Sequence, residues 1–203
     1  MMNCEEAWRK TKSLYPSERI RIAYRLDEVP AECRCDIARE LADDEHPRAR
    51  RYVARNLGEV PEECRCELAR KLSEDDDEWI RYEVAHNLGK LPEECSCELA
   101  RKLSEDDDEW RVRERVAYNL DELPEECACE LARKLAEDDV WVVRKNVAIN
   151  LDELPEECAC EIALKLVKDK HPEVRRWVKA VADRLPEECR KRVKILATFG
   201  GGQ

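Results

Sequence analysis

Residues 92–119 read PEECSCELARKLSEDDDEWRVRERVAYN, and close copies lie on either side, PEECRCELARKLSEDDDEWIRYEVAHN at 61–87 and PEECACELARKLAEDDVWVVRKNVAIN at 124–150. The unit recurs every 31 or 32 residues. The same point in successive copies is marked by Pro30, Pro61, Pro92, Pro124, Pro155 and Pro186. A fixed period of this length indicates a repeat protein in which each copy is one small structural unit.

Each copy predicts two helices separated by a short acidic turn. Proline followed by glutamates suits a helix start, and apolar residues at helical spacing predict a first helix over about Pro92–Leu103. A second helix is predicted over about Trp79–Leu88. We expect an asparagine near the end of each second helix to adopt the left-handed cap, at Asn56, Asn87, Asn119 and Asn150. No strand pattern occurs, so the sequence predicts an all-α solenoid of about six stacked two-helix units.

Several of these residues form motifs that occur in a known family. Val143-Arg144 is followed by Val147-Ala148, and His46-Pro47 and His171-Pro172 stand where the family often has Asp-Pro. The chain resembles the HEAT-like repeats, especially the short phycobilisome-lyase type, over nearly its whole length. VARNLGEVP (53–61) is similar to the leucine-rich-repeat variant, and the near-identity of the copies is similar to artificial consensus HEAT-like proteins. The resemblance implies a binding role, with the second helices lining a concave face, and no particular reaction.

One elongated domain is expected over residues 1–203. Its predicted parts are an N-terminal capping unit (1–29), five internal repeats (30–185), a C-terminal capping helix (186–197) and a disordered tail (198–203).

Cysteines are placed in register with the repeat, as Cys-x-Cys in each internal copy. Residues i and i+2 lie about 200° apart around a helix, so Cys95 and Cys97 point to opposite sides, each toward a neighbouring first helix. Facing Cα atoms of packed helices lie roughly 3.5–5.5 Å apart, which overlaps the distance range of disulfides. The two end units lack only the cysteine that would have no partner, since Cys4 aligns with the second of a pair and Cys189 with the first.

This arrangement predicts six disulfides between successive units. They are Cys4–Cys33, Cys35–Cys64, Cys66–Cys95, Cys97–Cys127, Cys129–Cys158 and Cys160–Cys189. Two alternatives are that the cysteines are small core residues or that they bind a metal or an iron–sulfur cluster. The first does not explain the missing end cysteines. The second needs ligands that converge on one point, which opposed cysteines do not provide.

Composition indicates a very stable protein. Charged residues make up 42% of the chain, and Gln203 is the only glutamine, a pattern typical of hyperthermophiles, in which intracellular disulfides also occur. The start MMNCEEAWRK has no apolar segment of a secretion signal, and no run is apolar enough for a membrane span. We therefore expect a cytoplasmic protein of a thermophile, with an archaeon as the favoured source. A secreted or an engineered chain are the alternatives.

Charge argues against nucleic acid as the main partner, because the net charge is −11. Arg48, Arg50, Arg51 and Arg55 nevertheless form a local basic stripe. We interpret the stripe as a solvated face with salt bridges, and the alternative is a small anionic contact site. The acidic turns 75–78 and 106–109 could attract calcium, but they lack EF-hand spacing, and capping of the second helix explains them better.

Variable positions on the second helices are the candidate partner-binding residues. They lie away from the buried stripe and include four of the five tyrosines. The predicted set is Tyr24, Arg51, Tyr52, Arg55, Tyr82, His86, Arg115, Tyr118, Lys145, Ile149 and Trp177. Tyrosine, tryptophan and arginine are common anchors of protein interfaces, although the same residues could simply be exposed helix positions. Trp79, Trp110 and Trp141 are instead expected to pack between units.

The leading function is therefore a non-enzymatic scaffold that binds another protein, with no cofactor, metal or membrane. The sequence leaves the oligomeric state open, and a monomer is favoured. One alternative is a structural or assembly component that stacks end to end. A second is an enzyme, by analogy with HEAT-like lyases and nucleic-acid glycosylases. The histidines His46, His86 and His171 are spread along the chain, and no catalytic motif is present, so an enzyme has the weakest support.

Overall fold

The computed structural model describes residues 2–106 and 109–199, and its regular elements are all helical within these ranges. The α-helices are α1 (Cys4–Thr11), α2 (Pro16–Tyr24), α3 (Ala31–Ala42), α4 (Pro47–Arg55), α5 (Glu62–Leu72), α6 (Glu78–His86), α7 (Glu93–Leu103), α8 (Trp110–Tyr118), α9 (Glu125–Leu135), α10 (Trp141–Ile149), α11 (Glu156–Leu166), α12 (Pro172–Val181) and α13 (Glu187–Phe199). Short 3-10 helices are η1 (Leu26–Glu28), η2 (Leu57–Glu59), η3 (Leu88–Lys90), η4 (Leu120–Glu122) and η5 (Ala182–Arg184).

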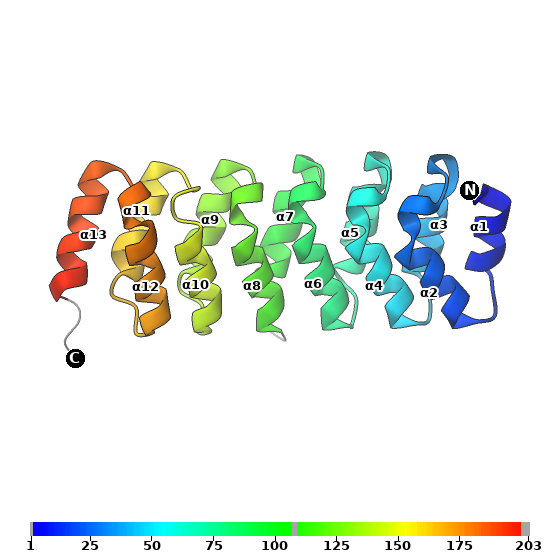
Figure 1. The fold of residues 1–203 in the computed structure, drawn as a ribbon, viewed down its shortest axis with the longest axis horizontal. Coiled ribbons are helices and arrows are strands. Elements are labelled where there is room, and N and C mark those ends of the chain that lie inside the picture. The colour runs from blue at the N-terminus through cyan, green and yellow to red at the C-terminus, as the bar shows by residue number, and fades with distance from the viewer. Residues whose placement is uncertain (1, 107–108, 200–203) are drawn as a thin grey trace. The chain divides into compact units, whose positions relative to one another are not determined.

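The chain alternates between two kinds of helix, as the repeat predicts. We call the odd-numbered helices A helices and the even-numbered ones B helices. The contacts divide the chain into two compact units, residues 1–99 and 100–203, with the division inside α7. Within each unit every repeat packs one A and one B helix, and consecutive helices of the same kind lie side by side (Figure 1). The all-α solenoid fold predicted from the sequence is thereby confirmed.

Proline precedes the A helices from α3 onward, and these helices begin one residue later than expected, because the proline is not itself helical. Pro30, Pro61, Pro124 and Pro155 are N-cap residues with ψ of 138° to 141°, so the helix begins at the residue that follows. The glutamates then fill the first turn, where the positive end of the helix dipole favours them.

Helices α4, α6, α8 and α12 begin with side-chain caps, whereas α2 and α10 have none. Asp77 Oδ1 accepts a hydrogen bond from the backbone N–H of Trp79 at 2.9 Å. His46 Nδ1 accepts from Arg48 N at 3.2 Å and His171 Nδ1 from Glu173 N at 3.3 Å. Each cap satisfies one of the N–H groups that a helix start leaves unpaired. The predicted capping role of the acidic turn is confirmed at Asp77. For Asp107 and Asp108 the prediction lies outside the described residues.

A repeating apolar stripe forms the core. Leu68 and Leu72 of α5 and Val84 of α6 are buried, as are Leu131 and Leu135 of α9 at the matching positions of another repeat. Each fully buried side chain of this size contributes about 1.5–3 kcal/mol through burial alone. Because the stripe recurs in every repeat, the core consists of many small layers between helices.

The asparagines after the B helices were predicted wrongly. Asn56, Asn87, Asn119 and Asn150 have φ of −99°, −103°, −98° and −88°, and no described residue, glycine included, has a positive φ. Their side chains reach back to the end of the preceding B helix. Asn87 Nδ2 donates to Ala54 O at 3.1 Å, and Asn150 Nδ2 donates to Ala117 O at 3.0 Å. The asparagine therefore satisfies helix-end carbonyls of its neighbour instead of turning its own backbone.

Disulfides join consecutive A helices within each unit. Bonds form at Cys4–Cys33, Cys35–Cys64, Cys66–Cys95, Cys129–Cys158 and Cys160–Cys189. Their Cα–Cα distances of 5.5–6.1 Å lie in the usual disulfide range. Cys97 and Cys127 are disulfide-bonded as well, and no cysteine in the described part of the chain is free.

The described part of the chain ends in a helix. Helix α13 continues to Phe199, and the remainder of the predicted tail, 200–203, lies outside the described residues. Across 2–106 and 109–199, no helix is long and apolar enough to cross a bilayer. The division into a single domain with capping units stays a prediction.

Candidate functional site

Exposed side chains of the B helices form the first candidate surface, and in the first unit several predicted residues meet. Tyr24 of α2 and Tyr52 of α4 come from neighbouring repeats, and their rings contact edge to face with centroids 5.1 Å apart. Tyr24 is 56% exposed and Tyr52 is half-buried. Arg55 and His86 occupy the equivalent position to Tyr24 in the next two repeats, and both are exposed.

Arg51 links this surface to the next repeat. Its guanidinium lies 5.1 Å from the ring centroid of Trp79 and forms an ion pair with Glu83 at 2.9 Å. Trp79 in turn contacts Tyr82 edge to face at 5.7 Å. Glu83 is buried, so the ion pair holds Arg51 in place while 40% of the arginine side chain stays exposed.

Trp79 is a surface residue that the sequence prediction missed. It is the second residue of α6, whereas Trp110 and Trp141 are the first residues of α8 and α10. One position turns a side chain by about 100° around the helix, which places Trp79 beside Tyr82 with 39% of its surface exposed. Aligning the repeats on their N-cap residues instead of on tryptophan would have revealed the offset.

Trp141 behaves as predicted and packs between repeats. Its ring stacks on His171, the cap of the next B helix, with centroids 3.9 Å apart and planes within 9°. His171 therefore has both a capping and a packing role.

The second unit carries the remaining predicted residues. Arg115 lies over the ring of Tyr118 at 4.9 Å, and Tyr118 is 49% exposed. Lys145, Ile149 and Trp177 are half-buried. This surface has fewer exposed aromatic rings than that of the first unit. Each of the two surfaces is a candidate by itself.

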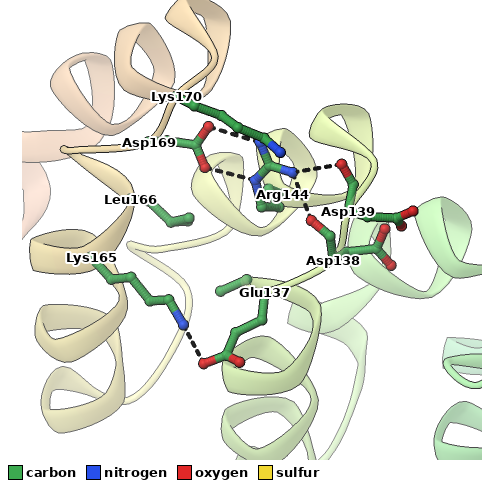
Figure 2. A pocket seen from close by; sticks show the side chains of 9 residues that line it. Glu137, Asp138, Asp139, Arg144, Lys165, Leu166, Asp169 and Lys170 are labelled. Carbon is green, nitrogen blue, oxygen red and sulfur yellow. Dashed lines mark hydrogen bonds and ion pairs between the residues drawn. The ribbon is translucent and has the colours of Figure 1, made fainter. Parts of the chain in front are cut away.

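A second candidate lies at the loop edge, where the A-to-B loops of successive repeats meet. Figure 2 shows a shallow hollow there, lined by acidic residues of the α9–α10 loop, by Arg144 and by residues of α11 and the following loop. Arg144 Nε and Nη2 donate to the carboxylate of Asp169 at 2.7 and 2.9 Å. Its Nη1 donates to the carbonyls of Asp138 and Asp139 at 2.6 and 3.0 Å. Lys165 pairs with Glu137 below them.

The same pair of residues recurs along this edge. An arginine of a B helix donates two hydrogen bonds to an aspartate of the next A-to-B loop, 25 residues later, in Arg19–Asp44, Arg50–Asp75, Arg113–Asp138 and Arg144–Asp169. Burial alone would raise the pKa of Asp169, but hydrogen bonds from Arg144 and from the backbone N–H of His171 outweigh it and lower that pKa. The hollow is thus already neutralised by its own residues, and we assign it to holding repeats together.

The basic stripe of α4 divides between these two surfaces. Arg50 belongs to the loop edge and Arg51 pairs with Glu83, which agrees with the predicted salt bridges. Arg48 and Arg55 are exposed, and neither side chain has a hydrogen bond or ion pair with any described residue. The two halves of the stripe therefore have different roles.

Metal binding has no site in the described ranges, where no group of three His, Cys, Asp or Glu side chains is placed to hold an ion. Asp75 and Asp77, candidates for calcium, bind Arg50 and the start of α6 instead.

These features define a solenoid of two-helix repeats whose exposed side chains form open surfaces. The chain belongs to the HEAT repeat family, whose model matches residues 36–121 and 105–182. No protein of curated function matches the sequence.

Solved structures show the same fold. Escherichia coli YibA is 18% identical with a TM-score of 0.66, over 98% of this chain and 74% of that chain. The complex of CpcE and CpcF of phycocyanin lyase from Nostoc sp. PCC7120 is 18% identical with a TM-score of 0.61, over 98% and 95%. An engineered protein is 19% identical with a TM-score of 0.58, over 94% and 96%. At these identities the likeness concerns the fold alone.

Proposed function

We propose that this protein is a non-enzymatic scaffold that binds a partner protein through the exposed side chains of its B helices. HEAT repeats generally mediate protein interactions. The observation that carries the proposal is the exposure of aromatic rings on these helices, at 56% for Tyr24, 39% for Trp79 and 49% for Tyr118. Aromatic rings and arginine dominate the binding energy of many protein interfaces.

The proposed surface includes Trp79 and the residues chosen from sequence. Tyr24, Tyr52 and Trp79 would supply apolar contact, with Arg51, Arg55 and Tyr82 around them. In the second unit Tyr118 and Arg115 would be the central contacts. Lys145, Ile149 and Trp177 are half-buried and would contribute less.

A non-enzymatic role is supported by the other uses of the reactive residue types. His46 and His171 cap helices through Nδ1. The cysteines are disulfide-bonded, and only a thiolate acts as a nucleophile. We propose further that the chain is a monomer and that its stability suits a thermophile's cytoplasm.

The test is a selection of displayed 16-residue peptides on the immobilised full chain. We expect enriched peptides to lose binding to the variants Tyr24→Ala or Tyr118→Ala. The melting temperature should hardly change, because both side chains are exposed and substitutions at exposed positions cost at most about 0.5 kcal/mol. Glu63→Ala and Glu126→Ala on exposed A-helix positions are the controls and should bind normally. The proposal fails if no peptide is enriched, or if both tyrosine variants bind like the controls.

A further inference from the structure

Helix α4 carries exposed positive charge with no acidic residue of its own. Its sequence is PRARRYVAR. Arg48, Arg51 and Arg55 follow one another at spacings of three and four, which places them along one side of the helix. Arg51 is held by Glu83, whereas the side chains of Arg48 and Arg55 have no partner within the described ranges.

Other arginines of the same unit are used differently. Arg39 pairs with Glu67 and Arg70 with Glu98 at 2.8 and 2.9 Å. Arg34 donates to the carbonyls of Val29 and Glu59. In a chain of net charge −11, Arg9 of α1 and Arg21 of α2 are also exposed without a carboxylate partner among the described residues, but α4 is the helix of this unit that carries two such arginines. Electrostatic complementarity makes them suited to a negatively charged partner.

Aromatic rings flank this charge from both neighbouring helices. The Tyr24–Tyr52 pair lies on the α2 side, and Trp79 lies on the α6 side, where Arg51 contacts its ring. We call Tyr24, Arg48, Arg51, Tyr52, Arg55 and Trp79 the Tyr–Arg surface. Such a surface offers apolar contact beside positive charge. A ligand that uses both features needs an apolar group and a negative charge.

We propose that the Tyr–Arg surface binds an acidic peptide segment of the partner protein, an inference that rests on the proposed scaffold function. Carboxylates of the segment bind Arg48 and Arg55, and an apolar side chain between them packs on Tyr24, Tyr52 and Trp79. A peptide fits better than a nucleic acid. Duplex DNA carries one charge per about 1.7 Å, and two unpaired arginines in an acidic chain neutralise few of them.

The experiment uses peptides enriched on the full chain and measures their composition and affinity. We expect enrichment of Asp and Glu beside an apolar residue. Fluorescence anisotropy should show an affinity loss of about tenfold or more for Arg48→Glu combined with Arg55→Glu, because each exposed ion pair contributes up to about 1 kcal/mol and reversal adds repulsion. The matched control is Arg176→Glu with Arg192→Glu, two exposed arginines of the second unit with the same total charge change.

Other outcomes overturn the inference in distinguishable ways. Peptides that are neutral or basic, or that bind the Arg48/Arg55 double variant as well as the control, contradict an acidic ligand. If those peptides lose binding to Tyr118→Ala, the scaffold function survives and only the acidic-peptide inference falls. If no peptide is enriched, both fall. A twelve-residue oligothymidine that binds more tightly than the peptides, and loses binding in the same double variant, would assign the surface to nucleic acid.

Discussion

The A helices and the B helices are joined to their neighbours by different chemistry. Consecutive A helices share disulfides and exposed ion pairs such as Arg133–Glu161, whose side chains are 47% and 62% exposed. On the B side, the helices share buried asparagine hydrogen bonds, and the loops share pairs such as Arg144–Asp169, which are only 5% and 7% exposed. B helices also contact one another more extensively than A helices do.

This difference explains where the covalent bonds lie. Disulfides occur in the layer with less noncovalent contact between repeats, where a bond adds most. A solenoid repeat depends on its two neighbours alone, so it frays from its ends when one interface weakens. Packing and hydrogen-bonded polar groups hold neighbouring repeats together on the B side, and disulfide bonds do so on the A side.

Removing one bridge should have the largest effect. Cys129→Ala with Cys158→Ala opens a bond between residues 29 apart, and loss of such a cross-link costs roughly 3–4 kcal/mol in the chain-entropy model. Chemical unfolding followed by circular dichroism measures the change. Reduction of the wild type with phosphine should lower stability further. A double variant as stable as the oxidised wild type would contradict a structural role for this layer of bonds.

Arg144→Met tests the B side and should cost about 3 kcal/mol. It leaves Asp169 nearly buried without its cation, and a buried charge without a partner is strongly destabilising. The matched variant Arg133→Met breaks the exposed pair with Glu161 and should cost at most about 1 kcal/mol. Equal losses in the two variants would mean that burial does not distinguish these ion pairs.

Asn150→Ala should cost about 1–2 kcal/mol, because the carbonyls of Ala117 and Tyr118 lose a donor. Urea unfolding gives the loss. Asn3→Ala is the comparison, since its side chain caps an exposed helix start near the end of the chain. If Asn150→Ala costs no more than Asn3→Ala, the buried asparagine does not join the repeats.

The sequence predicts those features of the structure that follow from the repeat and from helix geometry. The period, the helical spacing of residues such as Leu68 and Leu72, and the positions of Cys4 and Cys189 predict the fold and the layer of disulfides, because each follows from helix geometry. The hydrogen bonds from the asparagines to the preceding B helix were missed, because the sequence of an asparagine after a helix fits a left-handed cap equally well. Only the distance to the neighbouring helix decides between them.

The candidate surfaces were less predictable. Tyr24, Tyr52 and Arg51 were found because they occupy positions that vary between repeats. Such positions vary because core packing does not fix the identity of residues outside the buried stripe. Trp79 was misjudged because its shift by one position relative to Trp141 depends on where each helix begins. Arg50 and Asp75 form an ion pair although they lie 25 residues apart in the sequence, and no local sequence pattern predicts that pair.

Acidification should have the smallest effect on stability as long as the pH stays near neutral. At lower pH it should affect the ion pairs of the A side and of the B side differently. Hydrogen bonds from arginine overcome burial and lower the pKa of Asp44, Asp75, Asp138 and Asp169. A carboxyl whose pKa is lowered by folding contributes full stability above its unfolded value, near 3.8 here, and loses it as pH falls through the folded value. Stability attributable to these pairs should therefore hold from pH 7 to about 4 and then fall.

High salt and the variant Arg144→Met together show which ion pairs cause the loss of stability in acid. Arg144→Met leaves burial as the main influence on Asp169, so its pKa rises and the loss should begin at a higher pH than in the wild type. Glu130 also has a lowered pKa, through its hydrogen bond from Arg101, but that pair is about half exposed, and 1 M salt with a screening length of about 3 Å weakens it. Urea unfolding between pH 7 and 2.5 in 1 M NaCl should show Arg101→Met following the wild type, with Arg144→Met displaced. Coincidence of Arg144→Met with the wild type under these conditions would place the acid sensitivity outside the Arg–Asp pairs of the loop edge.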